Sequence, residues 1–238
     1  MKHVANIFVT ALLGVMFATG AWAAEAASET VPEVPEGWIV IREEAWIVFA
    51  DESAGYFQEA YFDFLEGNAQ AAPLSIRKGA TILRIEARRA KKDVKRSLKA
   101  SVKELEQLAK AIEKDSVVTA AKLEETFSRA EYALAQHHYH KALEYEAKKA
   151  YSEMAYSVYA AATYLLRASA WSHEGLEPDD ARAARESQSV GKKFVQGAAW
   201  VPKKVGEAMK GVGRGIQKLG KKIKLSKPNS YWEEFTGE

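Results

Sequence analysis

The chain of 238 residues contains no cysteine. A disulfide, a lipid-modified cysteine and a thiolate nucleophile are therefore excluded, and the fold must be held by its buried core. Long apolar runs are also missing after residue 23, whereas a membrane span needs roughly 20 apolar residues. We expect the mature protein to be soluble or peripheral to a membrane.

Catalytic motifs are missing as well. The chain has no GxSxG nucleophile elbow, no dinucleotide-binding glycine pattern and no HExxH or Glu-x-x-His motif. Residues 215–222, GIQKLGKK, nearly match a phosphate-binding loop, but Lys222 stands where Ser or Thr must hold Mg²⁺. We therefore expect a protein that is not an enzyme, and no small-molecule substrate is indicated.

The N-terminus has the pattern of a secretory signal peptide. Lys2 leads into the apolar run VANIFVTALLGVMFATG, and small residues follow at Ala21 and Ala23. We assign residues 1–23 to a cleaved signal and expect a periplasmic or secreted protein. Residues 24–37 then form an acidic linker that contains proline.

Residues 38–200 are predicted to form the main domain. Apolar side chains recur at helical spacing and no series of alternating strands appears, so the fold class is an all-α, up-and-down bundle with long antiparallel helices. A capping-box pattern at Ser101 and Glu104 predicts that one helix bends or restarts near residues 97–101. The expected helices cover about 53–66, the stripe from Ile76 to Val94 and its continuation to Ile112, one stretch from about 120 to 172, and a last helix from about 179 that Pro202 stops.

Residues 201–238 are predicted to form a basic amphipathic arm. Its centre, VGEAMKG VGRGIQK LGKKIKL, repeats Val or Leu followed by Gly every seven residues. On a helix at about 100° per residue, one face is apolar and the opposite face is largely basic. The apolar stripe consists of Val205, Met209, Val212, Ile216, Leu219 and Ile223. The cations expected to bind an anionic surface are Lys203, Lys204, Lys210, Arg214, Lys218, Lys221, Lys222 and Lys224.

The glycines of this arm weaken it as an isolated helix. Each interior glycine costs about 0.8–1.0 kcal/mol relative to alanine, so the arm needs a surface on which to fold. An anionic membrane or another envelope polyanion is one such surface, and the protein's own bundle is another. A partner protein is a third, whereas nucleic acid is disfavoured because no aromatic side chains are interleaved with the cations.

The charge distribution divides the chain in two. Residues 190–227 carry eleven Lys or Arg and one acid, Glu207, whereas residues 24–189 carry 22 basic and 28 acidic side chains. Such asymmetry indicates two parts with different partners, or two parts that bind each other.

A histidine-rich stretch, AQHHYHKALEYEAKK, carries the alternative function. His137, His140 and Glu144 lie at positions i, i+3 and i+7, and imidazole and carboxylate ligands suit Zn²⁺, Cu²⁺ or Ni²⁺. In the competing interpretation, His137 and His138 continue the Leu134 stripe as half-buried core residues and His140 is a surface neighbour of Glu144. No resident cofactor is otherwise expected. The sequence thus favours an exported helical binding or scaffold protein, with a periplasmic metal-binding bundle as the alternative.

Overall fold

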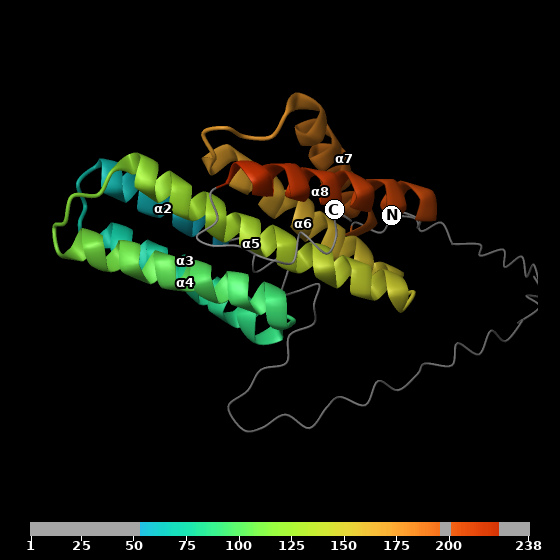
Figure 1. The fold of residues 1–238 in the computed structure, drawn as a ribbon, viewed down its shortest axis with the longest axis horizontal. Helices are drawn as coiled ribbons and strands as arrows, with labels where there is room; N and C mark the ends of the chain where they lie inside the picture. Colours follow the sequence, from blue (N-terminus) through green and yellow to red (C-terminus); the bar gives the residue numbers. More distant parts are fainter. Residues whose placement is uncertain (1–52, 196–200, 224–238) are drawn as a thin grey trace, which may run out of the picture. The chain divides into compact units, whose positions relative to one another are not determined.

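The computed structural model describes residues 53–195 and 201–223. These residues form a helical bundle without strands, as the sequence predicts (Figure 1). Within them no helix is long and apolar enough to span a membrane. The predicted signal peptide and linker lie outside the described residues. The helices are α2 (Ser53–Leu65), α3 (Ala71–Arg89), α4 (Lys92–Glu113), α5 (Ala120–Ala147), α6 (Tyr151–Trp171), α7 (Pro178–Val195) and α8 (Pro202–Lys222).

Helix α2 packs against α3, α3 packs against α4, and all three helices contact α5. Phe57 of α2 stacks on Phe127 of α5, with ring centroids 4.7 Å apart. The α3 stripe is buried as expected, with Ile76 and Leu83 at its centre. An exposed Arg77–Glu113 ion pair connects the start of α3 to the end of α4.

The predicted restart near residues 97–101 is wrong, because the chain reverses earlier. Ala90 and Lys91 adopt extended conformations between α3 and α4, and Ser101 is buried in the middle of α4. Ala90 and Val94 are buried on either side of this short turn. Because buried apolar residues keep their helical spacing on both sides of the turn, the periodicity of the sequence could not reveal that the chain reverses there.

The expected single helix over residues 120–172 is also wrong. The chain turns at residues 148–150, where Lys149 has a positive φ of 57° and the Ala150 amide donates to the Tyr145 carbonyl at 2.9 Å. The left-handed residue of a turn is usually glycine, and a lysine in this conformation is uncommon. Because residues 148–150 contain neither glycine nor proline, the sequence shows no sign of this turn. The result is a hairpin of α5 and α6.

Helix α5 is the central element of the bundle. Every residue from 126 to 138 is buried, because α2, α3, α4, α6 and α8 all contact this helix. The serine hydroxyl of Ser128 donates to the Ala168 carbonyl of α6 at 2.8 Å. Helices α7 and α8 then pack against α6 and each other.

Candidate functional site

The apolar stripe of α8 lies inside the bundle. All six stripe residues are buried, and they contact core side chains of α5 and α6. The most exposed of them, Ile223, retains 7% of its accessible surface. In this structure α8 is therefore a packed helix of the bundle.

The heptad glycines of α8 face tyrosines of α5. A Cβ atom built on Gly213 would lie 2.5 Å from the Tyr139 hydroxyl, and one on Gly220 would overlap the Tyr132 hydroxyl. The two glycines are seven residues apart in α8, and the two tyrosines are seven residues apart in α5. The later glycine faces the earlier tyrosine, so the two helices are antiparallel and the glycine repeat matches a tyrosine repeat. Gly206 is the third glycine of this seven-residue repeat, and a Cβ atom built on it would meet no atom within 4 Å.

Hydrogen bonds along the same contact hold α8 against its neighbours. Tyr132 donates its buried hydroxyl to the Ile216 carbonyl at 3.1 Å. The Ser187 hydroxyl of α7 lies 2.9 Å from the Ala208 carbonyl and donates to it. Because burial removes water from these carbonyls and hydroxyls, their pairing fixes the position of α8 as well as adding stability.

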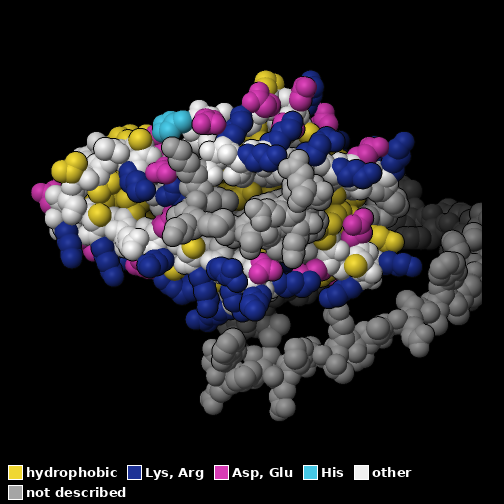
Figure 2. Space-filling view, viewed as in Figure 1, with side chains coloured by type: hydrophobic (Ala, Val, Ile, Leu, Met, Phe, Trp, Pro, Cys, Tyr) yellow, Lys and Arg dark blue, Asp and Glu magenta, His cyan; other side chains and the backbone are white. Residues whose placement is uncertain are grey.

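The basic face of α8 points away from this core. Lys203, Lys204, Lys210, Arg214 and Lys221 are exposed, and Figure 2 shows dark-blue side chains over the region of α7 and α8. Two further predicted cations form ion pairs with the preceding segment. Lys218 Nζ lies 2.7 Å from Asp180 Oδ2, and Lys222 Nζ lies 2.7 Å from Glu177 Oε1. Lys224 lies outside the described residues.

We give the name basic face to five of the exposed cations of α8, namely Lys203, Lys204, Lys210, Arg214 and Lys221. They occupy one side of a helix about 30 Å long, given a rise of about 1.5 Å per residue. Glu207 is the acidic side chain that lies among them on the exposed side of α8. This surface is the clearest single-sign feature of the predicted binding arm.

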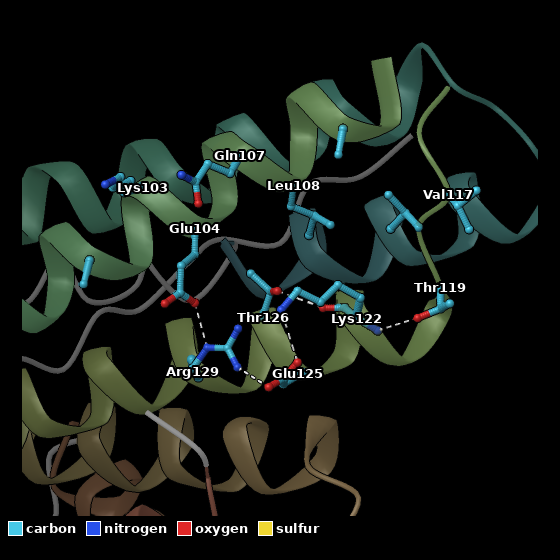
Figure 3. Close-up of a pocket in the computed structure, with 13 residues that line it drawn as sticks. Lys103, Glu104, Gln107, Leu108, Val117, Thr119, Lys122, Glu125, Thr126 and Arg129 are labelled. Atoms are coloured by element: carbon cyan, nitrogen blue, oxygen red, sulfur yellow. Dashed lines mark hydrogen bonds and ion pairs between the residues drawn. The ribbon is translucent and has the colours of Figure 1, made fainter. Parts of the chain in front are cut away.

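A groove of about 880 Å³ lies between α4 and α5 (Figure 3). Arg129 crosses its floor, with Nε 2.6 Å from Glu104 Oε2 and Nη1 2.6 Å from Glu125 Oε1. Leu108 and the fully exposed Val117 supply apolar lining. The guanidinium is thus neutralised by two carboxylates of the protein, and the groove presents no concentrated charge to a ligand.

The structure does not support the predicted metal site. His137, His140 and Glu144 line one pocket of about 260 Å³, but among the described residues no group of three metal-ligating side chains is arranged to hold an ion. His137 uses Nε2 on Glu86, 2.8 Å from Oε2, and Glu144 accepts from Lys91 at 2.9 Å. The three residues do share one side of α5, but Glu86 of α3 pairs with His137, and Lys91 of the α3–α4 turn pairs with Glu144.

Glu86 is a buried carboxylate that sequence reasoning missed. It has no exposed surface in the core of α3. Burial would raise its pKa, but the hydrogen bond from His137 and the electrostatic influence of the His138, His137 and Arg89 side chains lower it below its ordinary value. Since an ionised carboxylate can only accept, Nε2 of His137 carries the proton. Glu86 and His137 are 51 positions apart, so no local pattern could reveal the pair.

His138 is enclosed more completely than its neighbour. It is fully buried and stacks on Tyr164 of α6, with ring centroids 5.4 Å apart. Within the described part of the chain, neither of its ring nitrogens has a hydrogen-bond partner. Burial lowers the pKa of His138 to about 3, so the ring is neutral at physiological pH.

Comparisons of the chain with known proteins found no similar protein. No protein-family model, no curated protein and no solved structure matches this chain.

Proposed function

We propose that this protein is an exported, non-enzymatic helical scaffold that binds an anionic envelope surface through the basic face of α8. The observation that carries the proposal is the separation of the two sides of this helix. Its apolar stripe is buried in the bundle, while the five cations of the basic face, and Lys218 beside them, are exposed on the opposite side. The bundle presents these cations on a fixed helix, so binding needs no folding of the arm.

The buried stripe favours electrostatic attachment over insertion into the bilayer. A helix that lies in the interface plane buries its apolar face among acyl chains, and here that face already packs on α5, α6 and α7. Each Lys or Arg near an anionic leaflet contributes about 1 kcal/mol. Five such residues therefore supply several kcal/mol of attraction that salt weakens.

A vesicle co-sedimentation experiment tests the proposal. We expect the full chain to bind vesicles that contain phosphatidylglycerol and to leave phosphatidylcholine vesicles unbound. Replacing Lys210, Arg214 and Lys221 by Gln should remove about 3 kcal/mol, which weakens binding more than 100-fold. At 1 M salt, where the Debye length is about 3 Å, the wild-type chain should be released.

The matched control removes the same charge from another surface. Lys103, Lys110 and Lys114 are exposed cations in the second half of α4 and just beyond its end. Their replacement by Gln should leave vesicle binding within about twofold of wild type, because each charge acts within about one Debye length. Equal loss in both triple variants would show that net charge, not the α8 surface, attracts the vesicle. Absence of any binding to anionic vesicles would refute the proposal.

A further inference from the structure

The groove between α4 and α5 continues to the end of α8. A second hollow of about 350 Å³ lies beside the first turns of α5 and shares Thr119, Lys122 and Glu125 with the groove. Ile223, the last residue that the structure describes, lines this second hollow. The chain therefore leaves α8 at a surface that is continuous with the groove.

The direction of α8 leads the following residues towards the groove. The helix runs antiparallel to α5, and its end lies beside Ser128, which lines the same hollow as Ile223. Ile223 leaves the helix in an extended conformation, with φ −71° and ψ 116°. A chain that continues in this direction passes the first turns of α5, where the two hollows meet.

The groove has an apolar end where α4 connects to α5. Val117 is fully exposed there, and Val118 and Leu108 also line the groove. Figure 3 shows Val117 at one end of the groove, on the connection between the two helices. The groove follows α4 from Ala100 to Ala111, a length of about 16 Å at a rise of about 1.5 Å per residue. A short peptide with bulky apolar side chains would cover this end.

The residues after Ile223 have side chains that suit such a contact. Residues 224–238, which we call the tail, read KLSKPNSYWEEFTGE, and their aromatic side chains include Trp232 and Phe235. Residues 229–238 carry three Glu and no Lys or Arg, whereas three cations and two carboxylates line the groove and give it a formal charge of +1. The two surfaces are therefore of opposite sign, and each combines charges with apolar side chains.

The tail is long enough to reach the apolar end of the groove. Nine residues lead from Ile223 to Trp232, and they span up to about 30 Å when extended, at about 3.3 Å per residue. The path along α5 from Ser128 to Thr119, where the two hollows meet, is about 14 Å long by helical rise. The excess length lets Trp232 reach the α4–α5 connection without any movement of α8.

A second apolar stretch of the sequence has a less direct path. Residues 38–52 contain Trp38 and Trp46 and lead straight into α2. Helix α2 packs on α3 and α5, and no described residue of α2 or α3 lines the groove. The connection at Ile223 therefore favours the tail as the occupant.

We propose that residues 229–238 bind in the groove between α4 and α5 of the same chain, with Trp232 and Phe235 against Val117 and Val118. The groove is then a peptide-binding surface whose ligand is carried by the chain itself. The aromatic side chains bury apolar surface against the exposed valine, which supplies the attraction. This contact does not involve the basic face of α8.

The full chain tests the proposal, because its lack of cysteine permits labelling at one chosen position. A nitroxide attached to Thr236→Cys lies next to the aromatic residues of the tail, and methyl NMR measures the paramagnetic broadening it causes relative to the reduced label. We expect broadening of the Val118 and Leu108 methyl signals. The Val205 signals should stay sharp, since Val205 lies about 27 Å from the end of α8.

Two further variants establish which side chains make the contact. Replacing Trp232 and Phe235 by Ser in the labelled chain should remove the broadening. Val117→Asp should remove it as well, and this side chain is fully exposed, so the bundle stays folded. Leu74→Asp is the matched control, because Leu74 is an exposed aliphatic residue that does not line the groove, and the broadening should persist.

A mixing experiment distinguishes the chain's own tail from that of a second copy. Spin-labelled chain without isotope labels is mixed with isotope-labelled chain that carries no nitroxide, and we expect no broadening. Broadening in this mixture would assign the groove to the tail of another copy and overturn the proposal. Sharp Val118 and Leu108 signals in the spin-labelled chain itself, or equal loss of broadening in Leu74→Asp and Val117→Asp, would overturn it too.

Discussion

The contact between Gly220 and Tyr132 predicts opposite effects for two alanine substitutions in one helix. At Gly206, where a Cβ atom meets nothing within 4 Å, alanine should stabilise the protein by about 0.8–1.0 kcal/mol through helix propensity alone. At Gly220 the same gain is opposed by the Tyr132 side chain. The new Cβ would overlap its hydroxyl and lie 2.9 Å from its Cζ.

The magnitude at Gly220 follows from two costs. Overpacking of a buried contact costs about 1–3 kcal/mol, because Tyr132 is fully buried and has no open space to enter. Displacement of its hydroxyl also breaks the bond to the Ile216 carbonyl, worth about 0.5–1.5 kcal/mol. After the propensity gain, Gly220→Ala should lower the free energy of unfolding by about 2 kcal/mol. The two variants should therefore differ by about 3 kcal/mol.

Urea unfolding followed by far-ultraviolet circular dichroism measures both values, and a double-mutant cycle tests their cause. Tyr132→Phe alone should cost about 1 kcal/mol, since it removes the hydroxyl that bonds to α8. In the Gly220→Ala background the same change should cost less or stabilise, because it also removes the overlap. If Gly220→Ala is as stable as Gly206→Ala, then α8 does not pack on α5 in this register and the reasoning fails.

Two other perturbations have effects of predictable sign. Gly191→Ala should lower the free energy of unfolding by about 1–3 kcal/mol and lower Tm in calorimetry, because its Cβ would lie 2.9 Å from the Tyr159 Cα, a backbone atom that cannot rotate away. A Tm equal to that of wild type would contradict the α6–α7 packing. For His138, the unfolded chain takes up a proton below a pKa of about 6.5, whereas the folded chain does not until about 3. Stability should therefore fall by about 2 kcal/mol through this residue between pH 7.5 and pH 5, and His138→Leu should abolish that part of the loss in urea titrations at both pH values. A pH dependence that His138→Leu leaves intact would assign the loss to other groups.

The bundle was predictable because its helices are amphipathic over long stretches. The stripes on α3, α4 and α8 have the spacing that buries one face, and their residues are the ones that are buried. The two errors in helix boundaries have one physical origin. At Ala90 and at Lys149 the chain reverses without the glycine or proline that usually marks a turn. Because alanine and lysine are also common inside helices, the sequence pattern reads through both turns as continuous helix.

The chemistry of the pocket could be predicted only in part. His137, His140 and Glu144 share a helix, so their proximity follows from spacing alone. Glu86, Arg89 and Lys91 reach the same place through tertiary packing, and they bring one more carboxylate and two more cations to it. A local pattern thus identified a group of neighbouring side chains but not the charged partners that tertiary packing adds to it.

The glycine repeat of α8 determines how closely the helix packs on the bundle, and through this packing it determines which side chains stay exposed. Towards the bundle, Gly213 and Gly220 leave room for tyrosine hydroxyls, so the helix approaches α5 closely despite its weak intrinsic propensity. Because this approach buries the whole apolar stripe, the opposite side is left with its cations and little apolar surface. The same residues cannot pack in the core and insert into a bilayer at one time. An attachment through α8 that leaves the bundle intact must therefore be electrostatic, and its strength should fall steeply with salt, whereas an inserted helix would hold at high salt and expose the α5 tyrosines.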